Sequence, residues 1–464
     1  MHLLISIFFN APHGGLHENV RATGRYMLSR KHRVTVICKP GSFAQQLQME
    51  GIGVIETDFS SSSFSSTLAV IEALHAKFPL DLVHAHPFAS RQLGMMVAQI
   101  LGLPCVVTMH GKYTDALSET IDDLDAVFPV SEGIRHYLIQ EGGALAPEKL
   151  HVIPNTPDDK LFMPAKRAVH KRLQVTISLV SRLDQDKAFI LEVFYHAVAH
   201  AAKRYPGKIC WEVVGQGTLQ EEVLQRVDEL RGTNRVNFSG WLQDEALRDA
   251  YRRSDAVIAP GRCALEAMSC GVPAIALGSK GYSGLVGPET WQHAVYTNFG
   301  GMGDKAKGYA PGSIEQDLDT LMVSAQSRRF LGRFGRRITQ QFFKANDAHQ
   351  RLLRFYRLVV EANKANPRVP VLRSEFLELR LQGLDVCRPK PNLLVLEHHC
   401  DRPKSLSFAW YLSRDDEVIE KFMYQPEPRR EILLPGPGRY QVRCFVQDEQ
   451  KRRISFIGAN VTME

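Results

Sequence analysis

The sequence lacks several features that would mark particular classes of protein. Its eight cysteines include no Cys-x-x-Cys pair, which argues against a disulfide framework or a zinc finger and favours reduced thiols in the cytoplasm. No apolar run reaches the ~18–20 residues that a membrane-spanning helix needs. The apolar opening segment 1–9 has no basic stretch before it, so we expect a buried first strand there and not a secretion signal.

A large excess of one charge is also missing. Lysine and arginine number 57 against 50 aspartate and glutamate residues, which gives a formal net charge of +7 over 464 residues. So small an excess does not predict a nucleic-acid-binding protein, but it is compatible with an acidic ligand or an anionic membrane surface. Hydrophobic residues at 44% and charged residues at 23% are typical of a globular protein. At ~150 residues per domain, we expect about three domains.

Short apolar runs alternate with helical stretches over the first three quarters of the chain. The runs are 32–38, 80–86, 104–109, 126–130 and 151–154, and the pattern restarts after Pro164 with 175–180, 209–214, 236–240, 256–259 and 274–277. Near-continuous apolar strands separated by helices predict parallel sheets that are covered on both faces. We therefore predict two doubly wound α/β domains, residues 1–165 and 166–366. The basic stretch 166–172 is expected to link them, and the helical segment 337–362 to close the second.

The composition changes after about Pro367. Segments 406–412, 417–419 and 440–446 have the character of strands, and proline and glycine separate them at 435–438. Short strands with close turns and little helix predict an all-β, immunoglobulin-like sandwich over residues 367–464.

Ligands of open α/β sheets bind beyond the carboxyl ends of the strands, so residues at those positions are the first candidates for a site. Gly14 and Gly15 follow the first strand, before a helix expected to begin near Glu18. They would let backbone amides approach a phosphate or a sugar, or they form an ordinary turn. Gly215 and Gly217 end a later strand in the same way.

Charged residues follow two other strands. Arg182 and Lys187 come after the run 175–180 and are five residues apart, so both could reach one polyanion. The alternative is a pair of solvated surface cations. Glu266 lies in a short helix flanked by small residues, where it could hold a ribose diol or merely favour the helix N-terminus. Gly281 and Gly284 belong to a glycine-rich segment that could supply phosphate-binding amides.

In their order and spacing, these segments resemble the retaining glycosyltransferases of family 4, which have the GT-B fold. In the second half the resemblance rests on VSRLDQDKA, VVGQGTLQEEV, VNFSGWLQDEALRDAYRRSDAVIAP and LEAMSCGVPAIA, the last being the most specific. In the first half it rests on LVHAHP, VVTMHG and VIPN, and overall it covers about residues 1–360.

The resemblance implies that the second domain holds a nucleotide diphosphate sugar and that the acceptor lies against the first domain. Arg182 and Lys187 would neutralise the leaving diphosphate, so no metal or other cofactor is required. Glu266 would hold the ribose, and His110 would contact the donor sugar. Without the resemblance, a strand-end histidine satisfied by backbone would be an equal interpretation of His110.

The sequence departs from the family pattern at one position. The family has two glutamates with seven residues between them, but the position eight before Glu266 is Ile258, and the loop 260–263 has no acid. The usual sugar-contacting carboxylate is therefore missing. The glycine-rich segment Gly281–Gly284 could fill that role through backbone contacts.

Two other segments suggest functions that the sequence favours less. Glu397, His398, His399 and Cys400 are adjacent, and neighbours on a strand point to opposite faces, so they do not predict a metal site. Segment 328–337 mixes arginines with apolar residues. It could contact an anionic membrane, but a solvated helix face with buried Phe and Leu is the commoner explanation, and we favour it.

We therefore expect a retaining glycosyltransferase that moves a sugar from a nucleotide diphosphate sugar to a glycan or lipid-linked acceptor, in bacterial surface polysaccharide synthesis. It would act in the cytoplasm or on the inner face of the cytoplasmic membrane, without nucleic acid. The alternative, supported by Ile258, is a catalytically silent subunit that binds a glycan or a nucleotide sugar. A dinucleotide-dependent oxidoreductase would need Gly-x-Gly-x-x-Gly after the first strand, which segment 13–18 does not supply.

Overall fold

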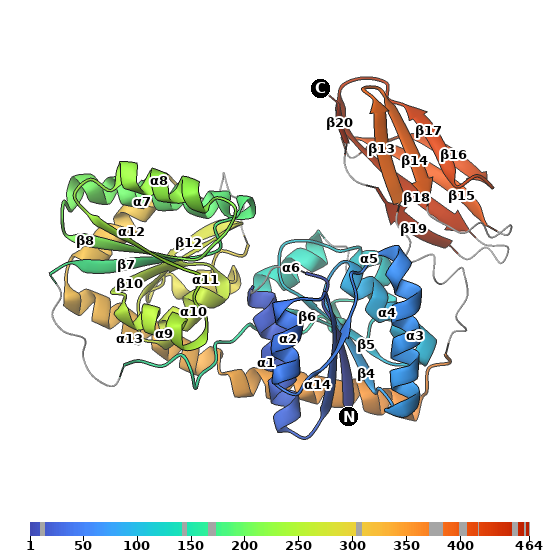
Figure 1. The fold of residues 1–464 in the computed structure, drawn as a ribbon, viewed down its shortest axis with the longest axis horizontal. Helices are drawn as coiled ribbons and strands as arrows, with labels where there is room; N and C mark the ends of the chain where they lie inside the picture. Colours follow the sequence, from blue (N-terminus) through green and yellow to red (C-terminus); the bar gives the residue numbers. More distant parts are fainter. Residues whose placement is uncertain are drawn as a thin grey trace.

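The computed structural model describes residues 1–9, 14–141, 146–165, 173–302, 309–370, 384–398, 406–415, 417–447, 453–458 and 461–463. These residues form two α/β domains that lie next to each other and a β-sandwich that follows them (Figure 1). Within these ranges, no helix is both long and apolar enough to cross a bilayer. The predicted linker 166–172 lies outside the described residues.

The first domain is built on a six-stranded parallel sheet in the order β3-β2-β1-β4-β5-β6. The strands are β1 (His2–Ser6), β2 (Arg33–Cys38), β3 (Gly53–Glu56), β4 (Leu82–Ala85), β5 (Cys105–Met109) and β6 (Ala126–Pro129). The helices are α1 (Gly15–Ser29), α2 (Ser42–Met49), α3 (Ser61–Lys77), α4 (Ala89–Leu101), α5 (Leu117–Thr120) and α6 (Glu132–Gln140). β1 and β5 are buried along their whole length, as continuous apolar strands covered on both faces must be.

The second domain repeats this plan with the order β12-β11-β10-β7-β8-β9. Its strands are β7 (Val175–Val180), β8 (Ile209–Val214), β9 (Arg235–Gly240), β10 (Ala256–Ala259), β11 (Ala274–Gly278) and β12 (Gly281–Leu285). Its helices are α7 (Ala188–Arg204), α8 (Gln220–Leu230), α9 (Asp244–Arg253), α10 (Gly261–Ser269), α11 (Trp291–Tyr296), α12 (Ser313–Met322) and α13 (Ala325–Phe342). β12 is antiparallel to β11 and the other strands are parallel, so the sequence-based prediction of two Rossmann-like domains in a GT-B arrangement is confirmed.

The last long helix returns to the first domain. α14 (Ala345–Ala365) follows α13 after a break at Phe343–Lys344 and runs beneath the first sheet (Figure 1). Its apolar side chains Leu352, Leu353 and Tyr356 pack in the core that contains β1 and β2. The sequence predicts one helical segment that closes the second domain, and the structure instead divides it between the two domains.

The structure also corrects the predicted strand 151–154. His151 and Ile153 donate backbone hydrogen bonds to the carbonyls of Val127 and Pro129, but only one bridge pair forms, between Val127 and Leu150. The segment stays a loop at the edge of the first sheet, because none of the described strands pairs with its other side.

The C-terminal residues form two antiparallel sheets, β13-β14-β17 and β16-β15-β18-β19, with β20 paired to β18. The strands are β13 (Leu384–Lys390), β14 (Leu393–His398), β15 (Ser407–Arg414), β16 (Glu417–Gln425), β17 (Arg429–Leu433), β18 (Gly438–Gln447), β19 (Arg453–Ile457) and β20 (Val461–Met463). Trp410, Phe408 and Tyr440 fill the core between them. His398 is buried in this core, whereas His399 and Cys400 lie outside the described residues.

Candidate active site

A cleft of about 950 Å³ lies between the two α/β domains, where the carboxyl ends of both sheets face each other. This is the position that the topology of open α/β sheets assigns to ligands. Most of the predicted site residues line it: Gly14, Gly15, His110, Arg182, Lys187, Gly215 and Glu266. The structure thus brings together residues that are up to 252 positions apart, from Gly14 to Glu266.

Three predicted glycines are not among the cleft residues. Gly217 packs against the backbone of Leu183, where an added Cβ would lie 2.3 Å from the carbonyl oxygen. Gly281 and Gly284 belong to β12, whose backbone pairs with β11. Gly278, the last residue of β11, and Ser279, in the turn before β12, line the cleft in their place.

Gly215 has a steric reason to be glycine. Its φ is +147°, and an added Cβ would lie 1.8 Å from the carbonyl oxygen of Ser181. The ends of β7 and β8 can approach this closely only without a side chain there. Ser181 and Arg182 are thereby held at the edge of the cleft.

The two predicted cations lie at the same end of β7 and share one acidic partner. Arg182 donates to Asp186 at 2.9 Å, and the Lys187 ammonium group donates to the same carboxylate oxygen at 2.6 Å. Arg182 also donates to Asp184 at 2.8 Å. Although partial burial opposes it, the bond from Lys187 and the charge of Arg182 lower the pKa of the Asp186 carboxyl. The Asp186 carboxylate therefore already occupies a position where both cations can bind an anion.

Glu266 lies in the middle of α10 and is 5% exposed. One oxygen accepts a hydrogen bond from Nε of Arg262 at 2.9 Å, and the other accepts one from the Tyr251 hydroxyl at 3.1 Å. Burial raises the pKa of the Glu266 carboxyl, and the charge of Arg262 opposes that rise. The carboxylate is therefore fixed in orientation and keeps lone pairs for a further donor, as a ribose diol would provide.

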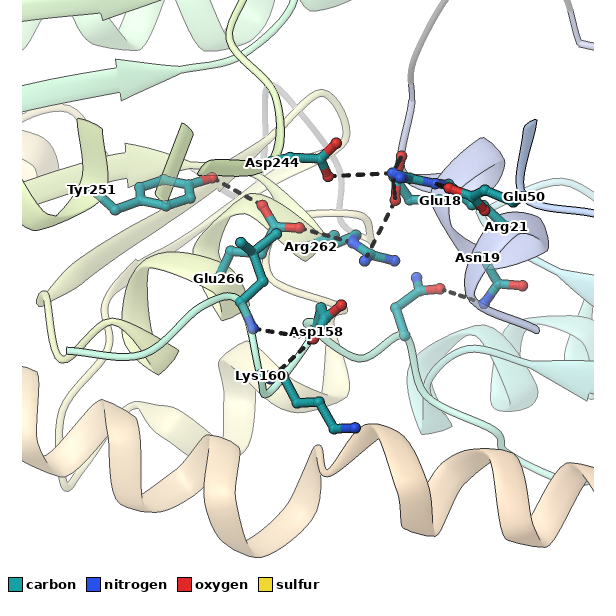
Figure 2. A network of polar contacts seen from close by, with 12 residues as sticks. Glu18, Asn19, Arg21, Glu50, Asp158, Lys160, Asp244, Tyr251, Arg262 and Glu266 are labelled. Carbon is teal, nitrogen blue, oxygen red and sulfur yellow. Dashed lines mark hydrogen bonds and ion pairs between the residues drawn. The ribbon is translucent and has the colours of Figure 1, made fainter. Parts of the chain in front are cut away.

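Charged side chains join the two domains across the cleft (Figure 2). Arg21 of α1 donates to Glu50 at 2.7 Å and to Asp244 of the second domain at 3.2 Å. Glu18, one turn before Arg21, lies 3.3 Å from it and 3.9 Å from Arg262. Four carboxylates therefore contact the two buried guanidinium groups of Arg21 and Arg262. Two of these contacts, Arg21 with Asp244 and Arg262 with Glu18, cross from one domain to the other.

His110 follows β5 and keeps part of its surface open to the cleft. Its Nε2 lies 2.9 Å from Nδ1 of His86, and the two rings stack with centroids 5.1 Å apart. His86 in turn stacks on His84, which contacts the Tyr356 hydroxyl at 2.6 Å. Burial lowers the pKa of His110 to about 3, so the ring is neutral at pH 7 and can act as a hydrogen-bond donor or acceptor.

Ile258, eight positions before Glu266, lies away from the cleft surface. Ile258 is fully buried in β10, where it packs in the core of the second sheet. No substitution at that position could bring a carboxylate to a sugar without disrupting this core. Among the described residues, no group of three histidine, cysteine or acidic side chains is arranged to hold a metal ion.

Three residues of the site are not predicted from the sequence: Arg262, Arg21 and Asp244. Arg262 precedes Glu266 by four residues on α10, a spacing that places both on one helix face, so a signal was present. Arg21 and Asp244 are 223 residues apart, and nothing local indicates their contact.

Comparison with known proteins agrees with this geometry. Residues 14–156 match the family model of the glycosyl transferase 4-like domain, and residues 174–297 match that of glycosyl transferases group 1. Two consecutive segments, one in each α/β domain, thus match glycosyltransferase domains, and the fold that they form is GT-B. Both segments end before the β-sandwich.

Curated relatives are distant. The chain is 22% identical over 293 residues to a D-inositol 3-phosphate glycosyltransferase of Segniliparus rotundus, a match that covers 56% of this chain and 62% of the relative. It is 26% identical over 266 residues to a D-inositol 3-phosphate glycosyltransferase of Kineococcus radiotolerans, covering 49% and 60%. The match to each of these relatives therefore spans less than two thirds of the relative's length.

Solved structures share the fold over the two α/β domains. A glycosyltransferase from Rickettsia africae superposes with a TM-score of 0.61 at 16% identity, over 78% of this chain and 98% of that one. HepE from Anabaena, solved in complex with UDP and glucose, gives 0.56 at 18% identity over 76% and 98%. Sucrose-phosphate synthase from Thermosynechococcus elongatus gives 0.60 at 18% over 78% and 99%.

Proposed function

We propose that the protein transfers a sugar from a nucleoside diphosphate sugar to a glycan or lipid-linked acceptor, with retention of the anomeric configuration. The observation that carries the proposal is the convergence of Arg182, Lys187, Glu266 and His110 on one cleft between two glycosyltransferase-like domains. The complex of HepE with UDP and glucose supports a nucleotide of this kind in a cleft of this fold.

Each residue has a role that its surroundings permit. Arg182 and Lys187 stabilise the diphosphate as it leaves, a task for which preorganised cations suffice without a metal ion. Glu266 accepts hydrogen bonds from the ribose. His110, kept neutral by its burial and oriented by its contact with His86, contacts the donor sugar from the first domain. The leaving phosphate assists attack on the same face of the sugar, which gives retention without a carboxylate nucleophile.

A catalytically silent binding protein is the second candidate, and the burial of Ile258 favours it. The family's sugar-contacting acid has no substitute on the loop 260–263, which carries Arg262 and Cys263 instead. A silent subunit would bind the nucleotide sugar without hydrolysing or transferring it.

The experiment is a panel of nucleoside diphosphate sugars, first by thermal shift and then by donor hydrolysis. A bound donor raises the melting temperature by mass action. For the donor that binds, Arg182→Ala and Lys187→Ala should each lower turnover by ~10²–10³ with the fold retained. Lys208→Ala, an exposed lysine outside the cleft, is the matched control and should keep full turnover. Donor binding with no turnover by the unsubstituted protein would support the silent subunit.

A further inference from the structure

The positive charge of the protein is concentrated in two consecutive helices. Segment 325–365, which forms α13 and α14, contains eight arginines and two lysines against one aspartate and one glutamate, a net charge of 10 − 2 = +8. The whole chain carries +7, so the remaining residues sum to 7 − 8 = −1. The modest overall charge therefore conceals a strongly basic region in an otherwise neutral molecule.

The arginines of α13 that face outward form a stripe. Gly332, Gly335 and Ile338 are buried, and the two glycines pack directly against the backbone of Gly271 and the side chain of Met268. At 100° per residue, Arg333 and Arg337 point away from that buried face. Arg329, Arg333 and Arg337 recur every four residues and are exposed, and α13 itself contains no acidic residue.

Apolar side chains accompany the stripe. The sequence favours a solvated helix face with buried Phe and Leu, and Leu331 is indeed buried while Phe334 packs half-buried against the core. Phe330, beside Arg333, is instead 52% exposed. On α14, Leu358 is 54% exposed one turn from Arg354, which is also exposed. Exposed aromatic and aliphatic groups among arginines are the composition of helices that lie in a membrane interface.

The two helices follow one another along the chain and lie on the outside of the two α/β domains. α13 runs along the outside of the second domain, and α14 continues from it beneath the first domain (Figure 1). We define the basic belt as the exposed residues Arg329, Phe330, Arg333, Arg337, Arg354 and Leu358. No belt residue lines the cleft between the domains, so the belt and the candidate active site can be occupied together.

We propose that the basic belt docks the protein on the surface of an anionic lipid bilayer, with Phe330 and Leu358 entering the interface between the headgroups. Charge complementarity is the basis: anionic headgroups supply the counter-charges that α13 lacks, and a flat bilayer can contact two helices that span both domains. The proposal does not depend on what the cleft binds or transfers.

The test measures co-sedimentation of the full chain with vesicles of phosphatidylcholine that contain about one third phosphatidylglycerol. We expect binding to these vesicles, little binding to phosphatidylcholine alone, and release at high salt, because salt screens charges at this range. The triple variant Arg329→Gln/Arg333→Gln/Arg337→Gln should lower the partition coefficient by about a hundred-fold, at roughly fivefold for each arginine. Phe330→Ser should lower it further at unchanged charge.

The matched control removes three exposed lysines elsewhere, Lys203→Gln/Lys208→Gln/Lys390→Gln, and should bind vesicles as the unsubstituted chain does. The melting temperature and the far-UV circular dichroism of every variant show that the fold is intact, whatever the cleft binds. Three outcomes would overturn the proposal: no binding by the unsubstituted chain, equal losses in the stripe and control variants, or binding to an RNA homopolymer through the stripe without binding to vesicles.

Discussion

Replacing Glu266 by glutamine removes the negative charge from the cleft and keeps the shape of the side chain. In the protein that carboxylate accepts hydrogen bonds from Arg262 at 2.9 Å and from Tyr251 at 3.1 Å. The side chains of Arg262 and Glu266 are only 9% and 6% exposed, so water in the cleft replaces these bonds only in part. Glutamine keeps an acceptor oxygen for one of the two donors and leaves the guanidinium without its main counter-charge.

We expect Glu266→Gln to lower the free energy of unfolding by about 3 kcal/mol. Removing one member of a buried ion pair costs ~3–5 kcal/mol, and Glu18, at 3.9 Å from Arg262, offsets part of the loss. The double variant Arg262→Met/Glu266→Gln removes the uncompensated charge as well and should recover most of the stability. Urea unfolding of the single and double variants measures both free energies.

The same substitution also tests the role of Glu266 toward the nucleotide. Hydrogen bonds to a charged group contribute ~1.5–3 kcal/mol, so losing the bonds to a ribose diol should weaken UDP binding by about ten- to a hundred-fold. Tyr251→Phe is the control, since it removes the other partner of Glu266 and keeps both charges. Calorimetry on the folded variants compares them. If Glu266→Gln binds UDP as tightly as Tyr251→Phe does, Glu266 serves only to hold Arg262 and the assignment is refuted.

Three further predictions concern the cations, the buried histidines and the sandwich. Asp186→Asn removes the carboxylate that Lys187 already contacts, so it should tighten UDP binding by a few fold in calorimetry. Lys187→Ala should weaken UDP binding. If both variants bind UDP more weakly, Asp186 orients the cations and does not compete with the diphosphate. Burial lowers the pKa of His84 and His110 to about 3 while the unfolded chain titrates near 6.5, so stability is complete above that pH and falls as the pH drops toward 3. Urea titrations at about pH 7.5 and 5.5 measure this effect. Between these two pH values, each of the two histidines should lower the free energy of unfolding by about 1.4 kcal/mol, and His84→Gln should remove its share of that loss. A chain ending at Pro370 should fold and bind UDP as the full chain does, because none of the described sandwich residues lines the cleft; loss of UDP binding by the folded truncation would make the sandwich part of the catalytic unit.

Much of the fold follows from the sequence because the central strands are mostly apolar and are buried on both faces. β7 and β10 could be located in this way, since a fully buried parallel strand needs no polar face. The sequence does not predict β3, because this strand is four residues long and only Ile55 in it is buried. The sequence does not predict β12, because its glycines suggest a loop. In the structure this glycine-rich segment forms an edge strand that is held by backbone hydrogen bonds to β11.

The partner of α14 could not be inferred from its own sequence. Its apolar residues have helical spacing, which predicts a buried face but not the domain that covers it. The choice is fixed by tertiary contacts such as the hydrogen bond between the Tyr356 hydroxyl and His84, two residues that are 272 positions apart. The candidate site divides in the same way: Arg182 and Glu266 could be predicted from their positions after strands, whereas the contact of Arg21 with Asp244 could not.

The contacts across the cleft orient the two domains without locking them together. Arg21 is nearly buried, but Asp244 is 39% exposed, and an ion pair with an exposed partner contributes only ~0–1 kcal/mol. Arg21 also keeps Glu18 and Glu50 when Asp244 moves away, so opening leaves no guanidinium without a partner. Micromolar binding of a nucleotide, about 8 kcal/mol, far exceeds this contribution. We therefore expect the bound donor, and not the ion pairs between the domains, to determine how tightly the cleft closes.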